Sequence, residues 1–211
     1  MKLSEYEKSR VSGFTLIEML VIIGILGIIA ATLLPSVTHL KKAAKRAKAL
    51  TTVTDAKVAM NLYLQQKRAW SATMLEAREI DYNVAKELSD EDLLDLVVPD
   101  DPSTSTSLDR FGLLDDWGRD QLRRNPDVTS ETHTGTDGVD ISDHRIQFRL
   151  DENYDGYVDG SEGSPLGLKI RGNVILWSRG PDGKDDFENS GRRYPYDDLI
   201  SWDHSKVQAE N

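Results

Sequence analysis

The hydrophobic pattern of the chain is dominated by one almost unbroken apolar run, from Gly13 to Val37. A short polar segment precedes this run, and the one ionisable residue inside it is Glu18. A helix of about 24 residues rises by roughly 36 Å, which is enough to cross the hydrocarbon core of a bilayer. A carboxylate is costly in hydrocarbon, so Glu18 requires a partner. The pattern predicts a membrane-spanning helix over 14–37.

A second helical pattern follows the apolar run. Apolar residues recur at helical spacing from Leu50 to Leu64, which is typical of an amphipathic helix that continues to about Lys67. We therefore predict one long N-terminal helix, with a membrane half over 14–37 and an amphipathic half over 38–70. The basic residues between 41 and 48 suit lipid headgroups or an acidic domain of a neighbour, and equally a solvated helix face.

Strand patterns appear only in the last third of the chain. The segment from Arg145 to Leu150 alternates between polar and apolar residues, and 166–171 and 174–178 repeat the signal. Between the last two segments, 172–173 reads Gly-Asn, which predicts a two-residue hairpin turn. We expect a globular domain over 71–211, helical or looped to about residue 144. Its small antiparallel sheet would pack on the long helix, giving an α+β fold.

The residues around the start of the apolar run carry a specific motif. Gly13 is followed by Phe14, Thr-Leu-Ile and Glu18, then by the apolar run and Pro35. This arrangement resembles the N-terminal motif of type IV pilins and of type II secretion pseudopilins. The resemblance implies a type IV pilin-like fold and a leader over 1–13. It also implies a prepilin peptidase that cuts after Gly13 and methylates the new N-terminal Phe14, and a role for Glu18 in assembly.

Two alternatives concern this segment. An uncleaved signal anchor with an accidental Glu18 would show a similar apolar run. The second alternative concerns the orientation in the membrane. Lys and Arg are more numerous after the run than before it, and counted alone this charge difference favours a cytoplasmic C-terminal side. The family resemblance implies the opposite: a single-pass protein of the inner membrane with a cytoplasmic N-terminus and a periplasmic globular domain.

The composition narrows the choice of partners and of stabilising devices. The net charge is −10 and the sequence pI is about 4.9, so the chain repels nucleic acid and suits divalent cations. The sequence contains no cysteine, although an exported domain would be allowed disulfides, and bound metal is another way to stabilise a small domain. Many type IV pilins have a C-terminal disulfide loop, so its absence shifts the resemblance toward the pseudopilins, some of which bind calcium.

The first candidate calcium loop has the sequence DENYDGYVDGSE and fits the pattern D-x-[DN]-x-[DN]-G-x5-E in full. Ca²⁺ needs many hard oxygen ligands from a short arc, and alternate residues of this loop supply them. Because strand patterns flank the loop, we expect it to join two strands rather than two helices. The alternative is an acidic, solvated turn. The candidate ligands are Asp151, Asn153, Asp155, Tyr157 through its carbonyl, Asp159 and Glu162.

The second candidate loop runs from Ser178 to Trp202. It resembles the C-terminal calcium loop of the major pseudopilin, and the resemblance assigns ligands to Ser178, Asp182 and Asp198, with main-chain oxygens near 175 and 179. The alternative is a turn rich in glycine and aspartate without metal. One or two calcium ions are therefore expected in the whole domain.

The segment from Asp115 to Arg119, Asp-Asp-Trp-Gly-Arg, resembles the D-P-W-G-N segment of major pseudopilins. We expect a turn here, with Trp117 covering the edge of the core.

Enzymatic motifs are not found in the sequence. The four histidines are scattered, and no P-loop, G-x-S-x-G or G-x-G-x-x-G pattern occurs. We therefore expect no enzyme. The family resemblance implies a structural subunit, a pseudopilin that forms a periplasmic filament with itself and other pseudopilins on an inner-membrane assembly platform. One alternative is a minor type IV pilin for adhesion, motility or DNA uptake. A more distant alternative is a membrane-anchored enzyme.

Overall fold

The structure is a computed structural model, and it describes residues 14–103, 108–125, 128, 134, 140–185, 198–202 and 207–208. The chain divides into two compact units, Met1–Ala43 and Ala44–Asn211. The helices are α1 (Leu16–Lys67), α2 (Ala72–Glu76), α3 (Tyr82–Asp90) and α4 (Asp116–Arg124), with short 3-10 turns η1 (Leu108–Phe111), η2 (Ile141–His144), η3 (Gly160–Glu162), η4 (Pro165–Gly167) and η5 (Gly180–Asp182). The strands are β1 (Gln147–Leu150), β2 (Tyr157–Val158), β3 (Lys169–Arg171), β4 (Val174–Ser178), β5 (Leu199–Ile200) and β6 (Val207–Gln208).

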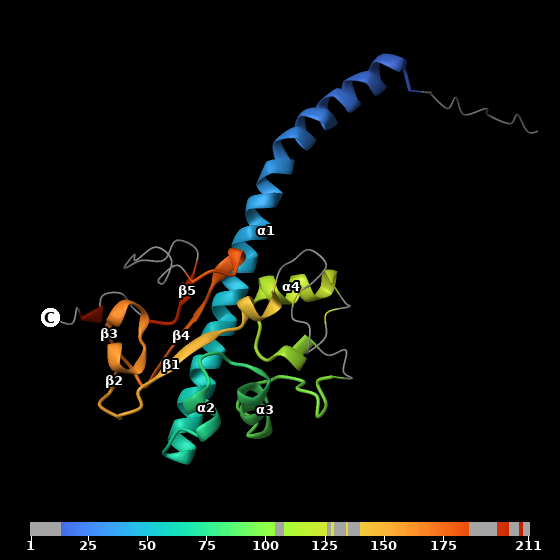
Figure 1. Cartoon of the computed structure of the whole chain (residues 1–211). Helices are drawn as coiled ribbons and strands as arrows, with labels where there is room; N and C mark the ends of the chain where they lie inside the picture. The colour runs from blue at the N-terminus through green and yellow to red at the C-terminus, as the bar shows by residue number, and fades with distance from the viewer. Residues whose placement is uncertain are drawn as a thin grey trace, which may run out of the picture. The chain divides into compact units, whose positions relative to one another are not determined.

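Helix α1 carries the predicted apolar run in its first half (Figure 1). Among the described residues it is the one helix long and apolar enough to cross a membrane, with a mean hydropathy of 2.6 over its most apolar 18 residues. The large apolar side chains of this half are exposed, for example Leu16 at 84% and Ile23 at 65%. An apolar surface of this kind is expected to contact lipid or other apolar helices rather than water.

The second half of α1 belongs to the unit Ala44–Asn211 and has one buried face. Val53, Ala56 and Met60 on this face have no exposed surface, as the amphipathic pattern predicted. The helix ends at Lys67 because Arg68 adopts a left-handed φ of 63°, and its N–H donates to the carbonyl of Leu64 at 2.9 Å.

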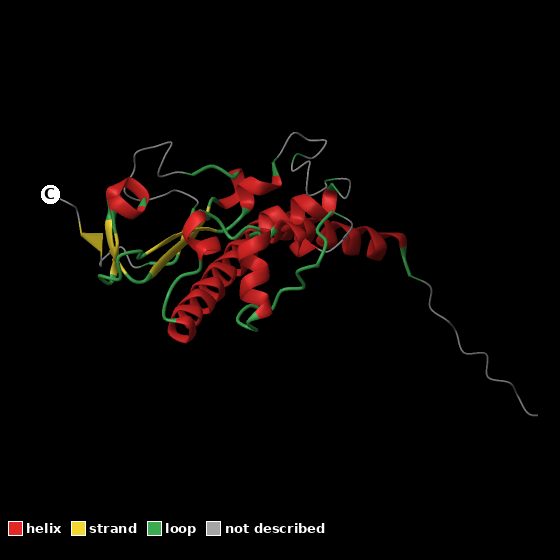
Figure 2. Cartoon of the chain, turned by 60° about the horizontal axis from the view of Figure 1, so that its bottom comes forward, coloured by secondary structure: helices red, strands yellow, loops and turns green. Residues whose placement is uncertain are grey.

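The strands of the second unit form two antiparallel three-stranded sheets, with orders β1-β4-β5 and β2-β3-β6. They gather on one side of this unit, while the short helices α3 and α4 lie on the other (Figures 1 and 2). Strand β4 lies between two cores. Val174 and Leu176 face a core shared with α1, α3 and β1, whereas Ile175 and Trp177 face a smaller core closed by Trp202. This α+β architecture is the fold class that the sequence predicted.

The predicted hairpin between β3 and β4 is wrong, because these consecutive strands belong to different sheets. Gly172 has a φ of 148°, and its N–H donates to the carbonyl of Gly156 beside β2. The carbonyl of Asn173 accepts from the N–H of Asp151 at the end of β1. Each residue of the Gly-Asn pair therefore extends a different ladder, and the chain crosses from one sheet to the other at this point.

Candidate functional site

The N-terminal end of α1 is capped by a reciprocal pair. The N–H and the hydroxyl of Thr15 both donate to Oε2 of Glu18 at 2.7 Å, and the N–H of Glu18 donates to the Thr15 hydroxyl at 3.3 Å. This is the geometry of a capping box, which satisfies donors that the first helical turn leaves free. Phe14 is 71% exposed just before the helix. Gly13 and the predicted leader lie outside the described residues.

The loop from Asp151 to Glu162 folds around its own carboxylates. Asp151 accepts hydrogen bonds from the N–H groups of Asp155 at 3.0 Å and Gly156 at 2.7 Å. Asn153 and Asp155 each accept from the N–H two residues ahead, at 2.8 Å. Gly156 adopts a φ of 85° with open space at its Cβ position, so the sharp turn at the sixth loop position is present.

Glu162 closes the other end of this loop. Its Oε1 accepts from the N–H groups of Glu152 and Asn153 at 2.7 and 3.2 Å, and its Oε2 accepts from Asp159 at 3.1 Å. Burial raises the pKa of Glu162, against the lowering effect of these backbone hydrogen bonds. Hydrogen bonds from Ser161 lower the pKa of Asp159. Glu162 is therefore a buried acceptor at the C-terminal end of the loop, whereas Tyr157 pairs with Arg171 as part of β2.

The loop is attached to the segment that follows α1. The indole N–H of Trp70 donates to the carbonyl of Asp151 at 3.1 Å, and the N–H of Trp70 donates to the hydroxyl of Tyr154 at the same distance. On the other side, Arg78 donates to the carbonyl of Glu162 at 3.3 Å. Since Trp70 is 5% exposed, the first of these bonds is buried. Sequence reasoning did not identify Trp70 as a neighbour of the loop.

The C-terminal candidate site begins with a buried pair that the sequence did not predict. Ser178 donates its hydroxyl to Oδ2 of Asp115 at 2.6 Å and accepts from the N–H of Gly180 at 3.1 Å. Nδ1 of His144 lies 3.5 Å from Oδ1 of the same aspartate, and all three side chains are buried. Asp115 also accepts from the N–H of Gly118 at 2.8 Å as the N-cap of α4. The predicted turn at this segment is therefore the start of a helix.

The other two carboxylates assigned to the C-terminal site lie in different surroundings. Asp182 is exposed, and its Oδ1 accepts from the N–H of Lys184 at 3.0 Å. Asp198 is buried, and so is Asp185, which accepts from the indole N–H of Trp177 at 3.1 Å. Asp185 was not among the predicted ligands. The one feature of the sequence that could have pointed to it is its position in an acidic, glycine-rich segment.

The donor chemistry of both loops suits a hard cation. The oxygens come from carboxylates, a carboxamide and a hydroxyl, and a carboxylate oxygen that accepts one N–H keeps a second lone pair. The described residues do not contain three or more His, Cys, Asp or Glu side chains grouped so as to hold a metal ion. The oxygens of the Asp151 loop are instead oriented toward its own N–H groups.

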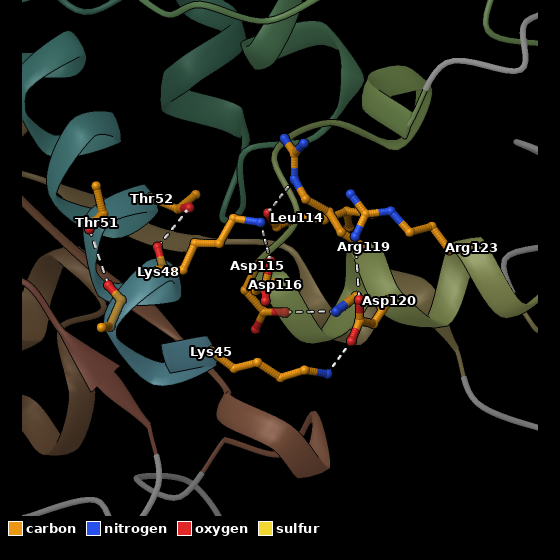
Figure 3. A network of polar contacts seen from close by, with 12 residues as sticks. Lys45, Lys48, Thr51, Thr52, Leu114, Asp115, Asp116, Arg119, Asp120 and Arg123 are labelled. Atoms are coloured by element: carbon orange, nitrogen blue, oxygen red, sulfur yellow. Dashed lines mark hydrogen bonds and ion pairs between the residues drawn. The ribbon is translucent and has the colours of Figure 1, made fainter. Parts of the chain in front are cut away.

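A network of polar contacts joins α1 to α4 inside the second unit (Figure 3). Lys45 forms an ion pair and a hydrogen bond with Asp120, and Lys48 pairs with Asp116 at 2.7 Å. The hydrogen bond from Lys45 holds the pKa of Asp120 below its usual value. Arg119 on α4 pairs at 2.9 Å with Asp109 of η1, the turn that precedes α4 in the chain. These contacts connect the amphipathic half of α1 to the helix that Asp115 caps.

A hollow of about 730 Å³ lies between α2 and α3. Glu87 in its wall accepts from the hydroxyls of Tyr63 at 2.6 Å and Ser71 at 2.8 Å, and Glu91 pairs with Lys67 at 2.7 Å. Burial, with a smaller effect of the hydrogen bond to Glu87, raises the pKa of Tyr63 to about 12. These carboxylates hold neighbouring side chains in place, which is a structural role.

Comparison with known families gives one match. Residues 8–34 match the model of the family described as the prokaryotic N-terminal methylation motif. No match to a curated protein sequence or to a solved structure was found. The matched segment covers the predicted cleavage site, Phe14, Glu18 and most of the apolar run.

The motif implies processing by a prepilin peptidase and pilus-like assembly, and it is consistent with membrane anchoring through α1. The fold after the motif, a long helix packed on one of two small antiparallel sheets, is consistent with a type IV pilin-like fold. The N-terminal methylation motif and this α+β fold together support a type IV pilin-like protein.

Proposed function

We propose that the chain is a pseudopilin, a structural subunit of a type II secretion-like filament in the periplasm that helps to move folded proteins across the outer membrane. The observation that carries the proposal is the methylation motif at the head of a continuous helix of 52 residues. This helix has an apolar first half for a membrane or a filament core, and its second half holds a folded domain. The lack of cysteine favours a pseudopilin over a pilin with a C-terminal disulfide loop.

In this proposal the subunit is anchored in the inner membrane, with its N-terminus in the cytoplasm and the globular domain in the periplasm. Its partners are prepilin peptidase, the assembly platform of the inner membrane, membrane lipid, and other copies of itself and of related pseudopilins. The acidic character of the chain, with a net charge of −10, gives no support to binding of nucleic acid.

Calcium is part of the proposal. In the C-terminal loop, Ser178, Asp182 and Asp198 would hold the ion, with main-chain oxygens nearby. In the other loop, the ligands would be Asp151, Asn153, Asp155, the carbonyl of Tyr157, Asp159 and Glu162. A bound divalent cation supplies positive charge that lets several carboxylates approach one another, and so stabilises the loop that carries them.

Deletion and complementation in the source cell test this function. We expect loss of the chain to retain folded secreted proteins in the periplasm, while surface pili, twitching and DNA uptake stay normal. Filaments purified from cells that overproduce the chain should contain it as a large share of their mass. If secretion is normal and pili are lost, the chain is a pilin subunit instead. If both are normal and the purified protein turns over a substrate, it is an enzyme.

A further inference from the structure

The second half of α1 has an exposed face without charge. Seven residues of this face lie within an arc of about 120° when the helix is drawn at about 100° per residue. The larger apolar side chains on it are well exposed, with Leu50 at 44%, Val58 at 53% and Leu62 at 40%. We call this face the uncharged strip, and its members are Ala47, Leu50, Thr51, Thr54, Val58, Asn61 and Leu62.

The polar groups of the uncharged strip are satisfied by the helix itself. The hydroxyls of Thr51 and Thr54 donate to backbone carbonyls one turn earlier at 3.1 and 2.8 Å, and the amide of Asn61 donates to the carbonyl of Lys57 at 2.7 Å. Removing water from such a surface leaves these donors paired, so the usual cost of burying a polar group is small.

The two edges of the uncharged strip carry opposite charges. Asp55 borders one edge, and Arg46 borders the other, nine residues earlier. Both side chains are exposed, and among the described residues neither has an ion-pair partner. Other charged residues of these edges are engaged within the chain: Lys48, beside Asp55, pairs with Asp116, and Lys57, beside Arg46, donates to the carbonyl of Ser201 at 2.7 Å. Among the described residues, Asp55 and Arg46 are therefore the charges at the two edges without an ion pair.

This arrangement is self-complementary for parallel helices. When two copies of the strip face each other in parallel, the Asp55 edge of one lies against the Arg46 edge of the other. When they face each other antiparallel, like edges meet and like charges repel. A parallel pair brings Asp55 and Arg46 together when one copy is shifted by nine residues, or about 13.5 Å along the axis. Opposite charges beside an apolar seam set register and orientation in the same way in coiled coils.

We propose that the uncharged strip binds the strip of a second copy of this chain, in parallel and with this stagger, so that Asp55 of one copy pairs with Arg46 of the other. The inference rests on the proposed function, in which copies anchored in one membrane lie in parallel within a filament. The contact is heterologous, because the two copies contribute different residues to the ion pair.

Cysteine cross-linking of the full chain in its native membrane tests the contact, and the absence of native cysteine makes each engineered thiol unambiguous. The stagger places Leu50 of one copy near Val58 of the other. Copies with Leu50→Cys and copies with Val58→Cys should form a disulfide-linked dimer when they are produced together. Each variant alone should give little dimer, because identical positions lie about 13.5 Å apart.

Charge reversal then tests the register in the same cross-linking pair. Asp55→Arg or Arg46→Asp alone should lower the cross-linked fraction about fivefold, because attraction becomes repulsion. The two reversals in one chain should restore it. Glu76→Arg, an equal change of charge at an exposed position outside the strip, should have no effect. Melting curves of every variant establish that the domain is folded.

Three results would overturn the contact. The first is a disulfide-linked dimer from Val58→Cys alone, and the second is a cross-linked fraction that the charge reversals do not change. The third is filaments without any cross-link, which would mean that lipid or another protein covers the strip. Electron microscopy of the same membranes separates this failure from that of the proposed function. If filaments form without the cross-link, the proposed contact between strips is contradicted and the proposed function is not. If the charge-dependent cross-link forms but the chain never assembles into filaments, the proposed function is contradicted and the contact is not.

Discussion

Glu18 and Thr15 satisfy each other at the head of the apolar helix, with two hydrogen bonds of 2.7 Å converging on one carboxylate oxygen. The other oxygen, Oε1, accepts no hydrogen bond from the described residues. The helix end is therefore capped within one chain, and half of the carboxylate stays available for a cation of another chain. After cleavage at Gly13, the amine of Phe14 on a neighbouring subunit would be such a cation, since methylation leaves its charge intact.

Replacing Glu18 by Leu should separate insertion from assembly. The variant should enter the membrane normally, because the change makes the span more apolar. Assembly should fail, because removing one partner of a buried charge pair typically costs about 3–5 kcal/mol. Filament yield after membrane extraction measures the effect. Thr15→Val removes the cap but keeps the carboxylate, so it should lose only about 0.5–2 kcal/mol of local helix stability. Normal filament yield from Glu18→Leu would refute the role of the charge.

The junction of Gly13 and Phe14 should be the processing site. The mature chain is expected to begin with N-methyl-Phe14. A bulky residue in place of Gly13 should block cleavage, because its side chain would keep the peptidase from approaching the backbone at this position. Mass spectrometry of the protein extracted from membranes measures both results. An intact Met1 end in the unaltered protein would contradict this prediction.

Features that depend on local periodicity were predicted correctly. The apolar run and the stripe from Leu50 to Leu64 lie on one helix, and the alternating segment before Leu150 contains β1. The prediction of a hairpin between β3 and β4 was wrong, because the rule for two-residue turns considers only the residues beside the turn. The partners of β3 are β2 and β6, and those of β4 are β1 and β5, so long-range pairing decided the outcome.

The candidate sites show the same limit. The spacing of acidic residues predicted a loop that begins at Asp151, and the hydrogen bonds of this loop do join residues close in sequence, while its binding of calcium stays a prediction. The pair of Ser178 and Asp115 spans 63 residues and has no local pattern, so it could not be found in this way. Trp70 is likewise 81 residues from the carbonyl that it binds.

The ion pair between Lys45 and Asp120 should make the stability of the second unit depend on acid pH. The pKa of Asp120 is lowered in the folded state, mainly by the hydrogen bond from Lys45. Its contribution is therefore present above the pKa of the unfolded chain, near 3.8, and is lost as the pH falls through the lower folded value. Both side chains are partly exposed, with 32% and 25% of their surface accessible, so we expect a loss of about 0.2–1 kcal/mol for Lys45→Met at pH 7.

Urea unfolding of the fragment from Ala44 to Asn211 at several pH values measures this effect. The difference between the wild type and Lys45→Met should shrink as the pH falls below the unfolded pKa of Asp120, near 3.8, and through its lower folded pKa. Lys184→Met, which removes an exposed lysine without a described ion pair, serves as the control. A difference that stays constant down to strong acid would contradict the assignment to Asp120.

Calcium should stabilise the same fragment, and the two loops should contribute unequally. An ion that binds only the folded state adds RT ln(1 + [L]/Kd), about 1.4 kcal/mol per site at ten times Kd. Backbone hydrogen bonds to Asp151 and Glu162 already close the loop between them. No disulfide holds the C-terminal loop, because the chain has no cysteine. The C-terminal loop should therefore depend on its ion more strongly than the other loop does.

Melting temperatures with calcium and with chelator test this ranking. The wild type should melt higher with calcium, Asp182→Ala should lose most of the rise, and Asp155→Ala should lose a smaller part. Glu76→Ala, outside both loops, should keep the whole rise. If the wild type melts at one temperature in both conditions, both acidic stretches are solvated turns. If Asp155→Ala abolishes the rise and Asp182→Ala does not, calcium binds the loop of the D-x-[DN]-x-[DN]-G pattern, and the assignment of the C-terminal ligands by resemblance is wrong.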